Sequence, residues 1–211
     1  ILQPVPGSSR ALAVACGLQT GIGDPDMESG HGDPYLMTIA AIDECVRNLV
    51  CVGADPSRIA ILDNFCWPSC KKPENLGSLV RAAEGCYDGA IAYRTPFVSG
   101  KDSLNNQLTV TNPDGSTRTI EIPPTLLITG LAIVPQVSKI VSMDAKRPGR
   151  AIVLVSGDTS PGVAMGGSIY SQLFGVPSSE HARVPRVDLQ SGPAAARAVH
   201  ELINAGLVHS A

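Results

Sequence analysis

Glu44 and Asn48 stand one helical turn apart in a stretch, residues 33–52, that otherwise carries mainly apolar side chains. A carboxylate against an apolar surface is costly unless it is paired or binds a metal ion. A carboxylate oxygen beside an amide oxygen suits Mg²⁺, which prefers oxygen ligands. The same spacing also allows Glu44 to pair with Arg47 or to cap a neighbouring element, and the residues alone leave these interpretations open. Asp43 and Arg47 are expected to form an ordinary i,i+4 ion pair.

A second polar group, Gly100-Lys101-Asp102-Ser103, follows a short predicted strand. The glycine permits close backbone approach, Lys101 supplies a cation and Asp102 an oxygen ligand, all of which are useful around a polyphosphate. The spacing is not that of a Walker loop. A plain turn with a solvated lysine is the alternative.

The remaining candidates for chemistry are weaker. Cys66 and Cys70 have a metal-like spacing, but no second Cys or His pair completes a tetrahedral site, and the six cysteines are expected to be free thiols. No histidine has an acid partner or a nucleophile at a telling spacing, so no catalytic residue is nominated. The histidines are His31, His181, His200 and His209.

Composition limits the classes of protein to consider. The chain has 211 residues, 44% hydrophobic and 17% charged, with a net charge of −3, as expected of a soluble globular protein. That charge argues against a nucleic-acid partner. No apolar run reaches the roughly 20 residues that span a bilayer, so we expect no membrane association and a cytoplasmic location.

Hydrophobic periodicity predicts an α+β arrangement. Strand 125–134 is almost continuously apolar, so we expect it to be buried on both faces. We expect the second helix to pack through Leu76, Leu79, Val80, Ala83, Tyr87, Ala90 and Ile91. The predicted elements are helices 34–52 and 74–93, strands 10–18, 58–65, 96–103 and 125–134, and a hairpin of 107–111 with 116–122 around Asn112-Pro-Asp-Gly115.

The chain divides into two predicted domains. The first spans residues 1–136. The second, 137–211, has a strand near 150–157, which starts another α/β layer, and a helix over 191–205. One clear strand is little for about 75 residues, which suggests that only the beginning of this second domain is present.

Five ordered segments resemble one family, phosphoribosylformylglycinamidine synthase, also called formylglycinamide ribonucleotide amidotransferase. They are DPYLMTIAAIDECVRNLVCVGADP (33–56), ILDNFCWP (61–68), ENLGSLVRAAEGCYD (74–88), TPFVSGKDSLNNQ (95–107) and IPPTLLITGLAIV (122–134). The resemblance is to the second aminoimidazole-ribonucleotide-synthetase-like half of its synthase part. It implies a small mixed sheet with helices on one face, which closes into a barrel by pairing, followed by the truncated start of an α/β C-terminal domain.

The resemblance also implies a function. The family is an ATP-dependent ligase that converts formylglycinamide ribonucleotide and glutamine-derived ammonia to formylglycinamidine ribonucleotide in purine synthesis. It implies ATP or ADP and Mg²⁺ as cofactors, Glu44 and Asn48 as Mg²⁺ ligands at a nucleotide site, and Lys101, Asp102 and Asn64 as residues near the nucleotide. The implied partners are the first synthetase-like half and the glutaminase component.

We expect the chain alone to be inactive, because the family's catalytic half and glutaminase have no counterpart in it, and to act as the non-catalytic half with an auxiliary nucleotide site. An open half-barrel would expose sheet edges and apolar surface, so homodimerisation is expected. The alternatives are another ATP enzyme of the superfamily, such as aminoimidazole ribonucleotide synthetase, or a purely structural pairing module. The loop Gly-Lys-Asp-Ser counts against the first alternative, whose members carry a Gly-Gly-Glu/Asp-Thr loop there.

Overall fold

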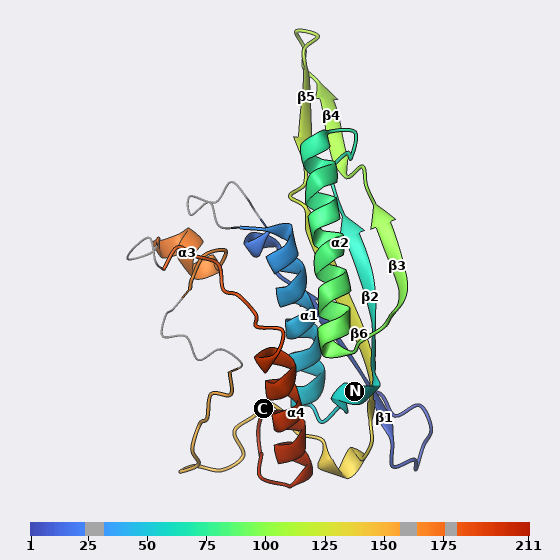
Figure 1. Cartoon of the computed structure of the whole chain (residues 1–211), viewed down its shortest axis with the longest axis vertical. Coiled ribbons are helices and arrows are strands. Elements are labelled where there is room, and N and C mark those ends of the chain that lie inside the picture. The colour runs from blue at the N-terminus through green and yellow to red at the C-terminus, as the bar shows by residue number, and fades with distance from the viewer. Residues whose placement is uncertain (24–31, 157–163, 176–180) are drawn as a thin grey trace.

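A four-stranded sheet organises the chain, in a computed structural model that describes residues 1–23, 32–156, 164–175 and 181–211. The strand order is β1-β6-β2-β3 (Figure 1). Strands β1 and β2 both run antiparallel to β6, and β3 runs parallel to β2, so the sheet is mixed as predicted. The strands are β1 (Ala11–Leu18), β2 (Ile59–Cys66), β3 (Phe97–Ser103) and β6 (Thr125–Val134).

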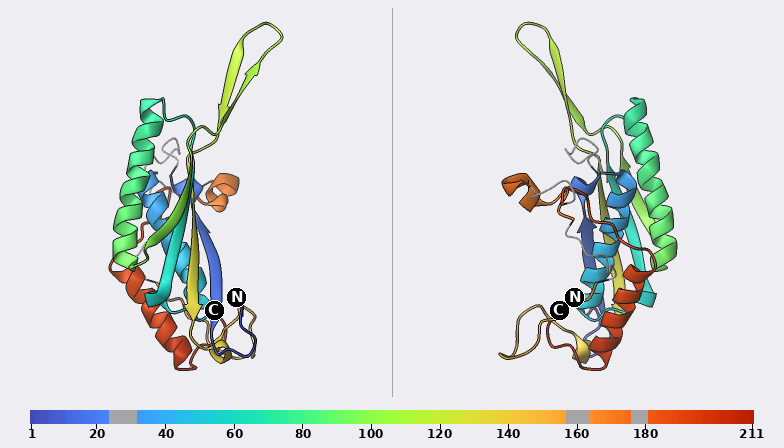
Figure 2. Two further views of the ribbon diagram at one scale, coloured as in Figure 1. Left: turned by 90° about the vertical axis from the view of Figure 1, so that its right-hand side faces the viewer. Right: turned by 60° about the vertical axis from the view of Figure 1, so that its left-hand side comes forward.

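Helices α1 (Pro34–Cys51) and α2 (Pro73–Tyr93) lie on the same side of this sheet (Figures 1 and 2). Asp33 is the N-cap of α1 and its side chain accepts a hydrogen bond from the Tyr35 amide at 2.9 Å. Gly53, at φ +98°, adopts the left-handed backbone that ends the segment. The prediction of a small mixed α+β sheet with helices on one face is therefore confirmed.

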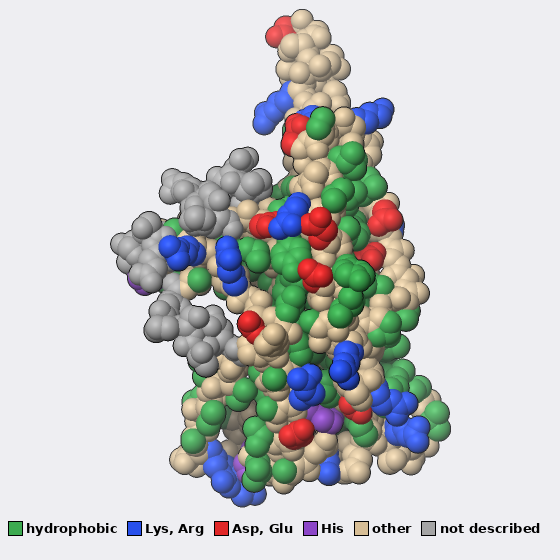
Figure 3. Space-filling view, in the orientation of Figure 1, with side chains coloured by type: hydrophobic (Ala, Val, Ile, Leu, Met, Phe, Trp, Pro, Cys, Tyr) green, Lys and Arg blue, Asp and Glu red, His purple; other side chains and the backbone are tan. Residues whose placement is uncertain are grey.

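The contact between α1 and α2 corrects one prediction. The most buried residues of α2 are Ala82, Gly85, Gly89 and Tyr93. A Cβ on Gly85 would lie 2.8 Å from Thr38 Cβ, so the two helices approach where α2 has no side chain. The expected packing face was wrong for most of its large residues, because small residues allow the closer approach. Leu79 is the exception, since it is half-buried and packs against the core. Leu76, Val80, Tyr87 and Ile91 are exposed instead, on the outer side of α2, where Figure 3 shows hydrophobic side chains.

Strand β6 corrects a second prediction. Its side chains alternate, so that Leu126, Ile128, Ala132 and Val134 are buried under the helices. On the other face Leu131 is 42% exposed. Burial on both faces is therefore wrong for the single chain, because no second layer covers the other side of the sheet among the described residues. We call this side the open face; its residues are Leu12, Val14, Cys16, Leu18, Ala60, Leu62, Asn64, Cys66, Ser99, Lys101, Ser103, Thr125, Leu127, Thr129, Leu131 and Ile133.

The predicted hairpin is confirmed as β4 (Gln107–Thr111) paired with β5 (Thr117–Glu121). It stands out from the body of the molecule, beyond one end of the sheet (Figures 1 and 2). Gly115, at φ +82°, closes the turn between the two strands.

The region after β6 is less regular than expected. Helix α4 (Ser191–Asn204) confirms the last predicted helix, and a short helix, α3 (Ile169–Phe174), precedes it. The strand predicted at 150–157 is wrong over its described part, since residues 151–156 have no regular structure. Ile152 and Leu154 are solvated, because no strand among the described residues pairs with this segment. Short 3₁₀ turns lie at Thr20–Ile22, Pro56–Arg58 and Val137–Lys139. No helix in the described part of the chain is long and apolar enough to cross a membrane.

Candidate nucleotide and metal site

Glu44 reaches from α1 to the end of β1. Its Oε2 accepts hydrogen bonds from the Leu18 amide at 2.8 Å and from Gln19 Nε2 at 2.9 Å. Since β1 is an edge strand, the Leu18 amide would otherwise face outward without a ladder partner. One oxygen of Glu44 thus caps a neighbouring element, which is one of the interpretations that the sequence left open. Gln19, its second donor, was not singled out from the sequence.

Asn48 holds the same edge one turn further along α1. Its Nδ2 donates to the Cys16 carbonyl at 3.0 Å. The amide oxygen of Asn48 and the second carboxylate oxygen of Glu44 have no hydrogen bond to any described residue. Each side chain therefore uses one polar atom to anchor β1, and its other atom is an oxygen with no partner among the described residues, which is the type of ligand that Mg²⁺ takes.

Asp43, beside Glu44, belongs to a separate buried network. It forms the expected ion pair with Arg47, although it is only 4% exposed. Tyr93 donates its hydroxyl to Asp43 Oδ1 at 2.5 Å. Burial, and then the charge of Asp43, raise the pKa of Tyr93 above its ordinary value. Arg47 is thereby engaged with Asp43, so the pairing of Glu44 with Arg47 is not the arrangement found.

Asn64 and Lys101 are neighbours on the open face. The strand register pairs Asn64 of β2 with Lys101 of β3, and the Lys101 ammonium donates to the Ser103 hydroxyl. Asp102 points to the opposite face, where it lies near Asp63. Burial, and then the charge of Asp102, raise the pKa of Asp63. Of the three residues expected near a nucleotide, the sheet therefore brings two together and separates the third.

The two polar groups lie at opposite edges of the sheet. Glu44 and Asn48 contact β1, whereas Lys101 and Asp102 belong to β3, with β6 and β2 between them. Three strand spacings amount to about 14 Å. The parallel direction of β1, β2 and β3 nevertheless places Leu18, Asn64 and Lys101 in one row near the same end of the sheet. A single small cation cannot contact both groups in this chain, but a ligand the size of a nucleotide could reach from one to the other.

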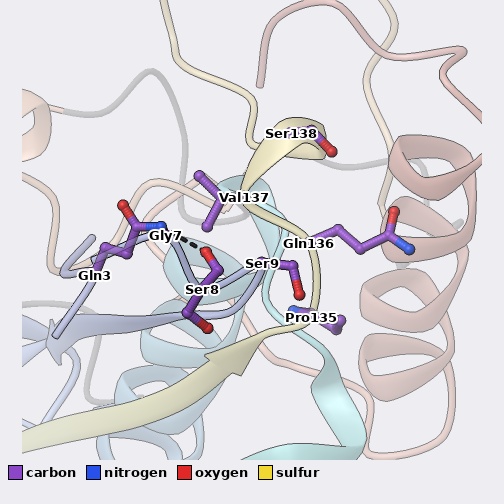
Figure 4. Close-up of a pocket in the computed structure, with 8 residues that line it drawn as sticks. All are labelled: Gln3, Gly7, Ser8, Ser9, Pro135, Gln136, Val137 and Ser138. Atoms are coloured by element: carbon purple, nitrogen blue, oxygen red, sulfur yellow. Dashed lines mark hydrogen bonds between the residues drawn. The ribbon is translucent and has the colours of Figure 1, made fainter. Parts of the chain in front are cut away.

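Two hollows of the surface lie elsewhere. The larger, about 610 Å³, is formed by the N-terminal segment and the residues after β6 (Figure 4). Its lining includes Gln3, Ser9 and Ser138 but no charged side chain. The smaller, about 250 Å³, lies where α4 meets α1 and the end of α2, and it is lined by His200, Asp55, Arg94 and Arg197 among others. Neither hollow contains a residue expected at the nucleotide site, and no spacing in the sequence signals the second one.

Thiol, imidazole and carboxylate side chains form no complete metal site among the described residues. All six cysteines are free. Within the described ranges, no group of three or more His, Cys, Asp or Glu side chains is placed to hold a metal ion. Of the histidines, His31 lies outside the described residues. At Glu44 and Asn48, this chain therefore offers part of a coordination shell and not a complete one.

An open mixed sheet with two helices on one face, and polar side chains at its rim, defines the class of domain. The family described as "AIR synthase related protein, N-terminal domain" matches residues 11–134, which include all four strands of the sheet and both covering helices. The chain belongs to this family.

Curated relatives make the resemblance more specific. The chain is 33% identical over 180 residues to phosphoribosylformylglycinamidine synthase subunit PurL of Methanocaldococcus jannaschii, covering 85% of this chain and 23% of that protein. It is 36% identical over 180 residues to the subunit of the same name from Gloeobacter violaceus, covering 85% and 21% respectively. The resemblance stated from the sequence segments is confirmed. The chain spans about a quarter of the length of these relatives.

A solved structure supports the fold. The structure titled "T. maritima PurL complexed with FGAR" superposes with a TM-score of 0.63 and 20% identity, covering 94% of this chain and 28% of that one. At this identity the likeness concerns the fold alone.

Proposed function

We propose that the chain is part of the ATP-dependent ligase that makes formylglycinamidine ribonucleotide from formylglycinamide ribonucleotide and glutamine-derived ammonia in purine synthesis. Its similarity to PurL subunits over 85% of its length supports this assignment. Residues 1–136 form the synthetase-like first domain, and residues 137–211 begin the second. The chain acts as the non-catalytic half and is inactive alone. Its location is the cytoplasm, and its partners there are the first synthetase-like half and the glutaminase component.

We further propose an auxiliary nucleotide site in which Glu44 and Asn48 ligate Mg²⁺. One observation carries this proposal. In each of the two side chains, one atom anchors β1 and one oxygen has no hydrogen-bond partner among the described residues. Glu44 and Asn48 would hold Mg²⁺ there, and the ion would supply positive charge against the phosphates of the nucleotide. Lys101 and Asn64 are the next candidates around the nucleotide, because a sheet paired on the open face would close over both of them. Asp102, which points to the opposite face, ranks after these two.

The open face is the proposed pairing surface. Val14, Leu131 and Leu18 are exposed there, and a domain of the same fold would bury them. In the intact enzyme that domain is the first synthetase-like half; in the purified chain a second copy takes its place, which gives a homodimer.

Calorimetric titration of Mg²⁺-ADP into the purified chain tests the nucleotide site. Glu44→Gln keeps an oxygen for the Leu18 amide but removes the charge and the second oxygen, so it separates anchoring from metal binding. We expect affinity for Mg²⁺-ADP to fall at least about tenfold in this variant, because a charged metal ligand is lost. Thermal stability should change little, because the remaining amide oxygen still accepts a hydrogen bond from the Leu18 amide. Asn48→Ala should act in the same direction.

The matched control is Glu84→Gln, which removes an exposed carboxylate that pairs with Arg81 on α2. It should bind Mg²⁺-ADP as the parent chain does. Equal affinity in the parent chain and in Glu44→Gln, or binding that survives removal of Mg²⁺ by EDTA, would refute the metal site. No binding by the parent chain would refute an auxiliary site that works in this chain alone.

A further inference from the structure

The hairpin of β4 and β5, which we call the arm, has no packing partner along most of its length within the described part of the chain. The two strands pair only with each other, and every residue in them except Glu121 is exposed. Its contacts with the body are at the base: Gln107 Oε1 accepts from the Ser69 amide at 3.3 Å, and Glu121 pairs with Lys72 at 2.8 Å. A lone two-stranded hairpin is only marginally stable in water. We therefore expect the arm to be stabilised by packing against a second surface.

The arm has one polar face and one mainly apolar face, which we call its apolar face. The register opposes Gln107 to Glu121 and Thr109 to Thr119, with the two threonine hydroxyls 3.0 Å apart. Side chains of a strand alternate between faces, so the intervening residues lie on the other side. There Leu108 is 61% exposed, Val110 41% and Ile120 48%, and Arg118, which the register places opposite Val110, lies on the same face nearer the turn.

The base contacts fix which way each face looks. Ser69 and Lys72 lie in the connection that leads into α2, so the face of Gln107 and Glu121 looks toward the helix layer. The apolar face therefore looks away from the helices, toward the side of the open face. Both views of Figure 2 show the arm leaning away from α2, in agreement with these contacts. The arm thus projects past the end of the open face, and its apolar face is turned toward the space in front of the open face.

We propose that the arm is a clasp: its apolar face packs against a domain of the same fold that docks on the open face, which in the purified chain is a second copy. This inference rests on the pairing proposed above. Four strands of about eight residues give the open face a footprint of about 500 Å², and the arm adds about a third. A standard interface buries about 800 Å² per partner, so the arm brings the contact closer to that size.

Sedimentation velocity over a range of concentrations tests the clasp. Leu131→Asp puts a charge in the middle of the open face and should abolish the dimer. Leu108→Thr with Ile120→Thr places β-branched, strand-forming residues at both positions and removes two of the three apolar side chains of this face. We expect this double variant to raise the dimer dissociation constant about tenfold or more, since two apolar interface anchors are lost.

Thr109→Ser with Thr119→Ser, on the polar face of the same strands, is the matched control and should dimerise as the parent chain does. Hydrogen exchange supplies a second readout: amides of β4 and β5 should exchange faster in Leu131→Asp than in the parent chain. A dimer that Leu131→Asp abolishes but that the arm variant leaves unchanged, with equal exchange in the arm, would overturn the clasp and leave the pairing intact. A parent chain that stays monomeric would overturn both.

Discussion

The two faces of the sheet are made by the same strands and behave differently. On β6, Ile128 is fully buried under the helices, and Leu131, three residues on, is 42% exposed on the other side. The covered face has its partner, α1 and α2, within the chain. The open face carries comparable aliphatic side chains without one. A sequence with apolar residues on both sides of a strand thus specifies two packing layers, of which this chain supplies one.

The residues of the candidate site are divided between the helix layer and the open face in the same way. Glu44 and Asn48 come from the helix layer and reach around to the β1 edge, where they hold the backbone of Cys16 and Leu18. Asn64 and Lys101 stand on the open face itself. Both groups therefore lie at the rim of the surface that lacks a partner, and that rim is where a domain docked on the open face would enclose a ligand.

The largest expected effect separates the two faces directly. Ile128→Ala should lower the free energy of unfolding by about 2–5 kcal/mol, because it leaves a cavity between sheet and helices. Leu131→Ala, on the same strand, should cost less than about 1 kcal/mol in dilute protein, where its side chain remains half in water. Urea unfolding followed by circular dichroism measures both. Similar losses for the two variants at low concentration would mean that the open face is covered within the chain after all.

The helix layer on the covered face gives the next contrast. A Cβ on Gly85 would lie 2.8 Å from both Thr38 Cβ and the Tyr35 carbonyl oxygen, whereas one on Gly77 would meet nothing within 4 Å. Gly85→Ala should therefore destabilise by about 1–3 kcal/mol through overpacking. Gly77→Ala should stabilise by up to about 1 kcal/mol, since alanine favours the helix. The same unfolding assay compares them, and a stabilised Gly85→Ala would contradict the close helix contact.

The sequence was most informative where one local rule dominates. Asp33-Pro34 predicts the start of α1, and Asn112-Pro-Asp-Gly115 predicts the hairpin, because capping and turn chemistry act over a few residues. The packing face of α2 was missed because its contact depends on glycines, which hydrophobic periodicity does not count. The strand at 150–157 was overpredicted because an apolar run says nothing of whether a neighbour offers backbone partners.

The candidate site could be predicted only in part for a similar reason. Spacing on one helix is enough to place Glu44 and Asn48 together, since residues four apart share a face. It cannot reveal that both anchor β1, which lies about 30 residues earlier in the chain. Likewise, the separation of Asp102 from Lys101 follows from strand alternation once β3 is known, but the sequence alone left open whether these residues formed a turn.

Two cysteines give the smallest contrast between the faces. Cys86 of α2 lies half-buried in the helix layer, where burial, and then the charge of Asp63, raise its pKa to about 12. Cys16 is exposed. Below about pH 9 the Cys86 thiol is protonated in both folded and unfolded chains, so its contribution to stability is present in full. Above that pH the unfolded chain releases the proton first, and stability falls as pH rises toward 12.

Cys86→Ala should therefore flatten the loss of stability between pH 9 and 11, by at most about 1.4 kcal/mol per pH unit. Cys16→Ala, which removes an exposed thiol from the open face, is the matched control. Urea midpoints measured at several pH values across this range provide the test, and the difference between variants cancels the titration of tyrosines and lysines common to all three proteins. An equal slope in Cys86→Ala and the parent chain would mean that the covered face does not shield its thiol from water, which would weaken the contrast between the two faces of the sheet.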